Sequence, residues 1–194
     1  RINYMKEIFP FQWKIALSWI SGYLIFQLFN PVLFATEGSK IAGQMGMTLV
    51  AINGISSISI SWINTKVPLF SKLIAKKQFI ELDNIFNKTT KQLSIINFIL
   101  TLILICFIFL SGYFKLSIVE RFLDISLIII LGIASFFNQF VFAWAAYLRS
   151  HKKEPLLVNS IVLGILISIS VLISAYYYGV TAVVISYSAI TLFV

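Results

Sequence analysis

Long stretches without a single charged residue recur along this chain and limit the folds open to it. Residues 15–36, 41–65, 92–114, 125–148 and 155–194 contain no Lys, Arg, Asp or Glu. A helix that crosses the roughly 30 Å hydrocarbon core of a bilayer needs about 20 mostly apolar residues. Each of the first four stretches has about this length, and the fifth is long enough for two crossings. The pattern therefore predicts a protein that crosses a membrane several times.

The last stretch divides at Gly179, which follows three tyrosines of the kind that gather at membrane interfaces. Ile, Phe and Thr are common in these stretches and favour strands in water, but an open strand in lipid leaves backbone groups unpaired. We therefore expect an all-α, polytopic transmembrane helical bundle. Its six expected spans cover residues 12–36, 41–65, 92–114, 125–148, 155–178 and 179–194.

Composition excludes a soluble globular domain. Only 11% of the residues are charged and 59% are hydrophobic, whereas a soluble domain carries roughly a quarter charged residues on its surface. The chain has too few charged residues to cover its own surface in water.

The segments between the spans alternate between basic and neutral. Residues 1–14, 66–91 and 149–154 carry net charges of +2, +4 and +2, while residues 37–40 and 115–124 have a net charge of zero. Because cytoplasmic loops retain Lys and Arg, the basic segments and both ends of the chain are expected in the cytoplasm. The total of +8 then reflects topology and contact with membrane lipids. No nucleic-acid partner is expected, since no soluble domain remains to bind one.

Residues 66–91 form the one sizeable loop between spans. Apolar side chains recur there at helical spacing in two groups: Leu69, Phe70, Leu73 and Ile74, then Phe79, Leu82 and Phe86. We interpret the segment as a cytoplasmic amphipathic loop of two short helices at the membrane interface. The alternative is that these helices simply prolong the spans on either side.

Two segments bear a family resemblance. The stretch that begins at Trp62, WINTKVPLFSKLIAKKQFIELDNIF, resembles the segment after the eighth span of the polysaccharide (O-antigen type) flippases. These flippases belong to the multidrug/oligosaccharidyl-lipid/polysaccharide exporter superfamily. The stretch YLRSHKKEPL, from Tyr147, is similar to the turn between their tenth and eleventh spans. Through these loops and the order of the spans, nearly the whole chain resembles the C-terminal half of the family.

The resemblance implies one six-helix lobe of a twelve-span transporter, and hence a fragment whose N-terminal six-helix lobe is missing. It implies a function in surface polysaccharide synthesis (O-antigen, lipopolysaccharide), in which an undecaprenyl-linked oligosaccharide is flipped across the bacterial cytoplasmic (inner) membrane by alternating access. Two alternatives stay open. One is a multidrug/toxin cation antiporter of the same superfamily, which normally has a carboxylate within the membrane. The other is a non-transporting multispan protein or a polytopic glycosyltransferase.

Catalytic and metal chemistry finds no support in the sequence. The charge-free stretches also lack His, because the lone His151 lies in the basic turn. The lone Cys106 lies within a span and has no second ligand. No glycine-rich phosphate loop is present. We therefore expect no enzymatic activity, no cofactor and no metal site.

The candidate binding residues are mostly amides within the spans. An unpaired amide in hydrocarbon is costly, so each is expected to face another helix or a wet cavity. The neighbours Asn138 and Gln139 point about 100° apart, so at least one of them is expected to line a cavity. We expect the Asn30–Pro31 pair to unwind the first span near its outer end, although a simple kink is the alternative.

The substrate implied by the resemblance divides these candidates between two roles. Amides suit sugar hydroxyls, whereas the diphosphate requires cations. Amide candidates are Gln27, Asn30, Asn53, Asn138 and Gln139, and cationic candidates are Lys14 and Arg149, with Lys152 and Lys153 nearby.

Overall fold

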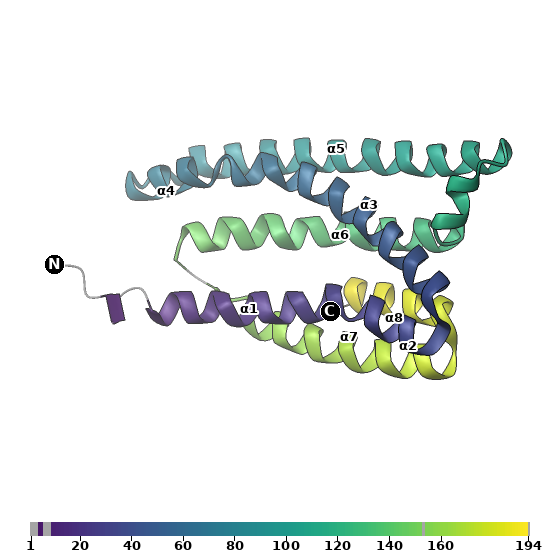
Figure 1. The fold of residues 1–194 in the computed structure, drawn as a ribbon. Helices are drawn as coiled ribbons and strands as arrows, with labels where there is room; N and C mark the ends of the chain where they lie inside the picture. The colour runs from purple at the N-terminus through teal and green to yellow at the C-terminus, as the bar shows by residue number, and fades with distance from the viewer. Residues whose placement is uncertain (1–3, 6–8, 153, 194) are drawn as a thin grey trace.

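The protein is a bundle of helices, seen in a computed structural model that describes residues 4–5, 9–152 and 154–193 (Figure 1). The helices are α1 (Phe9–Gln27), α2 (Phe29–Glu37), α3 (Ser39–Asn64), α4 (Val67–Ala75), α5 (Phe79–Tyr113), the 3₁₀ helix η2 (Ser117–Arg121), α6 (Ile125–Ser150), α7 (Leu157–Tyr177) and α8 (Gly179–Phe193). No strand occurs in these described residues. The predicted all-α bundle is confirmed.

Five segments are long and apolar enough to cross a membrane: Gln12–Glu37, Ser39–Ala75, Phe79–Tyr113, Ile125–Ser150 and Leu157–Tyr177. The sixth expected span corresponds to Gly179–Phe193, which is apolar but shorter. The chain thus has the architecture of a multi-pass membrane protein.

The first span is bent at Leu28 but not unwound, because Leu28 keeps a right-handed helical conformation (φ −71°, ψ −25°). The alternative of a kink near the Asn30–Pro31 pair is therefore correct, and the expected unwinding is not found. Helix α1 ends at Gln27 and α2 begins at Phe29, so Asn30 is already helical. Pro31 has no N–H to donate to the carbonyl of Gln27, four residues before it, whereas the N–H of Val32 reaches Leu28 O at 3.2 Å. The missing bond explains why the interruption falls before the proline.

Residues 66–91 fold differently from the interfacial loop we expected. The first amphipathic group forms the separate helix α4, with Pro68 in its first turn. The second group is the beginning of α5, which runs without interruption to Tyr113, so here the alternative of a prolonged span is correct. Figure 1 shows α4 and the start of α5 side by side along the bundle axis, and we call residues 66–91 the α4–α5 hairpin.

The apolar face of α4 is buried by protein. Phe70 and Leu73 belong to a cluster with Leu82 and Phe86 of α5 and Ala143 of α6. A helix that docks on a membrane keeps its apolar face free for lipid. The amphipathic pattern was therefore interpreted correctly as helical, but the partner of its apolar face is the bundle itself.

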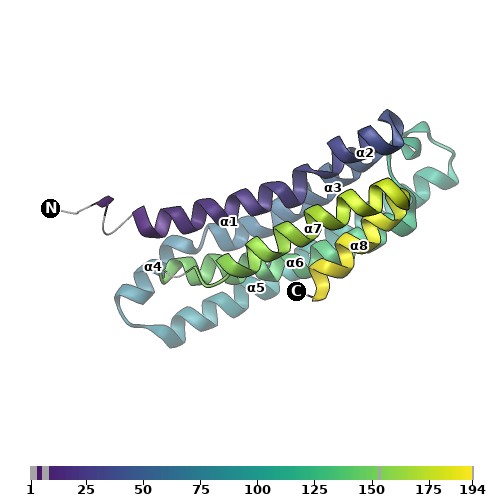
Figure 2. The same cartoon turned by 90° about the horizontal axis from the view of Figure 1, so that it is seen from below.

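The spans pack in an order that differs from their order in the chain. Helix α1 lies along α7, which pairs with α8, and α3 crosses between α2 on one side and α5 and α6 on the other (Figures 1 and 2). The larger core lies where α2, α3, α6, α7 and α8 meet, and its fully buried side chains include Phe29, Leu33, Met45, Ile128 and Val171.

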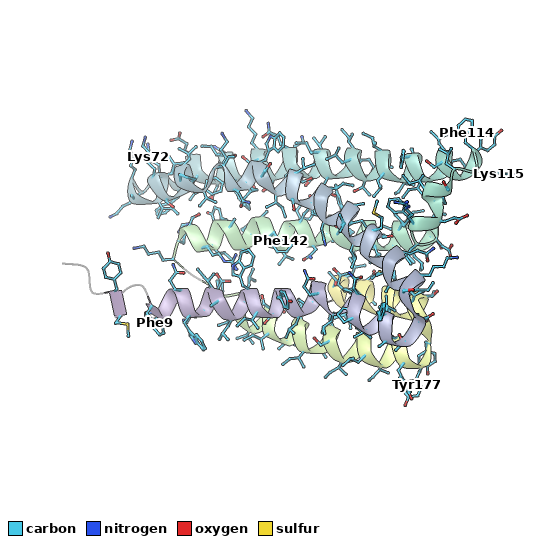
Figure 3. All side chains as sticks on the ribbon, viewed as in Figure 1. Phe9, Lys72, Phe114, Lys115, Phe142 and Tyr177 are labelled. Carbon is cyan, nitrogen blue, oxygen red and sulfur yellow. The ribbon has the colours of Figure 1, made fainter. Side chains whose placement is uncertain are left out.

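Charged segments separate to the two ends of the bundle. Lys72 of α4 and Lys115, after α5, lie at opposite ends (Figure 3). The hairpin and the C-terminus of α6 share the first end, the basic end, while the α2–α3 and α5–α6 connections share the other, the neutral end (Figure 1). Of the charged residues in the predicted pattern, Arg1, Lys6, Glu7 and Lys153 lie outside the described residues.

At the neutral end, Glu37 ties α2 to the first turn of α8. The backbone N–H of Val180 donates to Glu37 Oε1 at 3.1 Å, which satisfies one of the free donors at the start of that helix. The preceding residue, Gly179, has φ +77°, a left-handed conformation that other residues rarely adopt. A Cβ at Gly179 would also collide with Glu37 Oε1.

We expect Gly179→Ala to lower the free energy of unfolding by about 1–3 kcal/mol, because Ala is strained at this backbone conformation and displaces the Glu37 carboxylate. Thermal or denaturant unfolding in detergent measures the loss. Gly43→Ala is the matched control, since a Cβ at Gly43 meets nothing within 4 Å. Equal free energies of unfolding for the two variants would contradict a stabilising contact between Glu37 and the first turn of α8.

Candidate functional site: an amide-lined cavity

A cavity of about 40 Å³ lies between α3, α6 and α8. Its walls combine apolar side chains with amides and hydroxyls: Leu49, Ile52, Asn53 and Ser56 of α3, Leu131, Ser135, Asn138, Gln139 and Phe142 of α6, and Tyr187 of α8. The residues from α3 and from α6 each follow the spacing of one helical face. This volume is enough to hold water.

Gln139 is the most unusual residue of the cavity. Its side chain is 1% exposed, and neither Oε1 nor Nε2 has a hydrogen-bond partner among the described residues. Leaving a buried amide unpaired costs about 1–3 kcal/mol or more. Because the cavity borders this amide, water or a polar group of a ligand can supply the missing bonds.

The other two amides that line the cavity are more exposed than Gln139. Asn138 is half-buried and Asn53 is exposed, so the polar lining continues from the buried amide towards the bundle surface. The hydroxyls of Ser56 and Ser135, which also line the cavity, lie 2.7 Å apart in a hydrogen bond that joins α3 to α6. This bond holds the two walls of the cavity together.

No lining residue carries a formal charge near neutral pH. Amides and hydroxyls both donate and accept hydrogen bonds, so they suit water or the hydroxyl groups of a neutral ligand. An ion in the same place would lose its hydration without gaining an opposite charge, which is unfavourable within a membrane.

The structure brings three of the predicted site residues together and leaves the others apart. Asn53, Asn138 and Gln139 all line the cavity, and both members of the adjacent amide pair reach it. Gln27 is exposed at the end of α1, and the amide of Asn30 lies over Gly46 of α3. These two residues flank the bend at Leu28 in the first span.

The two predicted cations do not line the cavity. Lys14 is exposed on α1. Arg149 donates from Nε and Nη2 to the two carboxylate oxygens of Glu154, both at 2.7 Å, and Nη2 also lies 3.5 Å from Ser18 Oγ of α1. Its charge is therefore balanced within the chain, in a pairing at the α6–α7 turn that the sequence did not indicate.

Sequence reasoning also missed Ser135 as part of the site. The signal was present, because Ser135 precedes Gln139 by four residues and so shares its face of α6. Among the described residues, no group of three or more His, Cys, Asp or Glu is arranged to hold a metal ion.

Comparison with protein-family models, curated proteins and solved structures finds no match for this chain. The resemblance to flippases therefore rests on loop patterns and span order, and the function is argued below from the site.

We expect the Ser56–Ser135 hydrogen bond to contribute about 0.6 kcal/mol, and at most about 1.7, as other hydrogen bonds between transmembrane helices do. A double-mutant cycle with Ser56→Ala, Ser135→Ala and the double variant measures this coupling through the free energy of unfolding. Additive single effects would mean that the two hydroxyls do not interact.

We expect Arg149→Ala to destabilise the chain by about 3 kcal/mol, at the low end for buried pairs because Arg149 is partly exposed. The carboxylate of Glu154, whose side chain is 2% exposed, is then buried without a cation. The double variant Arg149→Ala/Glu154→Ala is expected to recover part of this loss in an unfolding assay. A double variant less stable than Arg149→Ala would contradict the prediction.

Proposed function

We propose that this chain is a lobe of a membrane transporter that flips an undecaprenyl-linked oligosaccharide across the bacterial cytoplasmic membrane, and that the cavity contacts sugar hydroxyls. The observation that carries the proposal is the buried amide of Gln139, which has no hydrogen-bond partner in the described part of the chain and borders a cavity with Asn53 and Asn138. A static bundle gains stability by pairing such an amide between helices. An unpaired amide in a cavity is instead available to a ligand.

The chemistry of the cavity favours a neutral, hydroxyl-rich ligand. Its polar groups are amides and hydroxyls, and Phe142 and Tyr187 add aromatic surface. Sugars present hydroxyl groups at their edges and C–H groups on their faces, which match these two kinds of wall. A cavity of about 40 Å³ accommodates hydroxyl groups rather than a whole sugar ring, so binding of the oligosaccharide requires a wider conformation.

The charges at the basic end suit the diphosphate of such a substrate. If this end faces the cytoplasm, Lys14 and Lys152, both exposed, lie on the side from which the substrate is loaded. Arg149 is paired with Glu154, so we assign contact with the diphosphate to these lysines.

The antiporter alternative requires a carboxylate within the membrane. Among the described residues, the carboxylates lie in connections, at helix ends or in the first turns of α5: Glu37, Glu81, Asp83, Glu120, Asp124 and Glu154. Glu37 accepts from the start of α8 and Glu154 pairs with Arg149. This arrangement favours the flippase over cation exchange through this lobe.

The test is flipping of a fluorescent undecaprenyl-diphosphate oligosaccharide by the complete transporter in proteoliposomes. We expect Gln139→Leu to reduce the flipping rate by about tenfold, the equivalent of one or two lost hydrogen bonds. Its free energy of unfolding should stay the same or rise, because Leu removes an unpaired buried amide.

Gln12→Leu is the matched control, since Gln12 is exposed on α1 away from the cavity. An unchanged flipping rate in Gln139→Leu would contradict a role of the cavity in binding. Transport of a cationic dye instead of the oligosaccharide would favour the multidrug antiporter.

A further inference from the structure

The interior of the bundle is polar between its two apolar clusters. Helices α3, α5 and α6 contribute to both clusters, and the buried residues that bound the gap on each helix are Ile52 and Ile63, Leu93 and Ile108, and Ala134 and Ala143. Between these limits each helix has a single buried residue, and all three are polar: Ser59, Asn97 and Gln139. We call these three residues the polar layer.

The packing of α5 on α6 brings Asn97 close to Gln139. Phe98, the residue after Asn97, packs on Phe136 with ring centroids 6.3 Å apart. Gln139 follows Phe136 by three residues, which is less than one helical turn. The two amides therefore lie within about 5 Å of each other along the bundle axis.

Gln139 lies where two faces of α6 meet. One face borders the cavity, and Gln139 belongs to its lining. The other face meets α5, since a Cβ at Gly132 would lie 3.1 Å from Thr101 Cγ2. Gln139 follows Gly132 by seven residues, about two turns, and so shares this second face. Its side chain thus connects the cavity with the side of α6 that α5 covers.

The amide of Asn97 has hydrogen-bonding capacity to spare. Its side chain is 0% exposed, and its Nδ2 has no partner in the described ranges. Its Oδ1 accepts from Thr101 Oγ1 at 3.5 Å, a long and weak bond. Neither polar atom of Gln139 is bonded to Asn97. The two amides can therefore bind a third group that both donates and accepts, as a hydroxyl does.

The cavity must widen to hold a sugar ring, and its two sides differ in what widening exposes. Figure 1 shows α5 and α8 on opposite sides of α6. Towards α8, buried Val183 and Val184 belong to the larger apolar core. Towards α5, separation of α3 from α6 at the Ser56–Ser135 hydrogen bond exposes the polar layer. Contact with a polar ligand is unfavourable for apolar side chains and favourable for amides that lack partners.

From this arrangement we propose that the wider conformation extends the site from Gln139 to Asn97, and that the amide of Asn97 binds a hydroxyl group of the sugar. The inference rests on the proposed function and adds to it a binding residue on α5, outside the present wall of the cavity. Nδ2 of Asn97 donates to the hydroxyl oxygen, while the amide of Gln139 binds the same hydroxyl or the next one on the ring.

The test measures binding of two lipids to the complete transporter in detergent: undecaprenyl diphosphate with and without a short neutral oligosaccharide. Each lipid is titrated, and binding raises the midpoint temperature of unfolding. We expect Asn97→Leu to weaken binding of the glycosylated lipid by about tenfold and to leave binding of the sugar-free lipid unchanged. Without lipid, its midpoint temperature should stay the same or rise, because Leu removes an amide that lacks a donor's partner.

Asn87→Leu is the matched control, since Asn87 is exposed on the same helix and the substitution is identical. Unchanged binding of the glycosylated lipid by Asn97→Leu would overturn the proposal, and a lower midpoint temperature would then assign Asn97 to holding the helices together. Equal weakening for both lipids would also overturn it, because the contact would not be with the sugar.

Failure of the proposed function gives a different result. In that case the unmodified transporter binds the glycosylated lipid no more tightly than the sugar-free one. If the unmodified transporter does prefer the glycosylated lipid, and Gln139→Leu but not Asn97→Leu removes the preference, only the extension to α5 is rejected.

Discussion

The lack of hydrogen-bonding solvent within a bilayer is the constraint from which the rest of this structure follows. Backbone groups must pair within each span, so a sequence rich in Ile and Phe forms helices where it would favour strands in water. The same constraint applies to side chains. Ser21, Thr48 and Ser59 each donate to a carbonyl one helical turn earlier in their own helix. Gln139 differs from these side chains, because neither of its two polar atoms has a hydrogen-bond partner among the described residues.

Features that depend on one helix could be predicted from the sequence. Charge-free stretches predicted the long apolar helices, Pro31 predicted a kink in the first of them to within a few residues, and apolar spacing revealed the helical character of residues 66–91. Each of these depends on the chain's local chemistry and on the thickness of a membrane, both of which a single sequence makes available.

Features that depend on contacts between helices could not be predicted in the same way. The sequence contains several amides within the spans, but only packing decides that Asn53 lines one cavity with Asn138 and Gln139. Packing likewise decides that the apolar face of α4 meets protein instead of lipid. The ion pair between Arg149 and Glu154 forms only because the α6–α7 turn folds back on α6. The net charge of residues 149–154 does not reveal this fold.

The contact between Glu37 and the first turn of α8 has a mechanical consequence. Because the carboxylate at the end of α2 accepts a hydrogen bond from the backbone N–H of Val180, the C-terminal part of the first span is joined to the last helix. Leu28, between α1 and α2, keeps a right-handed helical conformation (φ −71°, ψ −25°), so α1 and α2 form one kinked span. Because α8 also provides Tyr187 to the cavity, this one carboxylate links the first span to a wall of the candidate site.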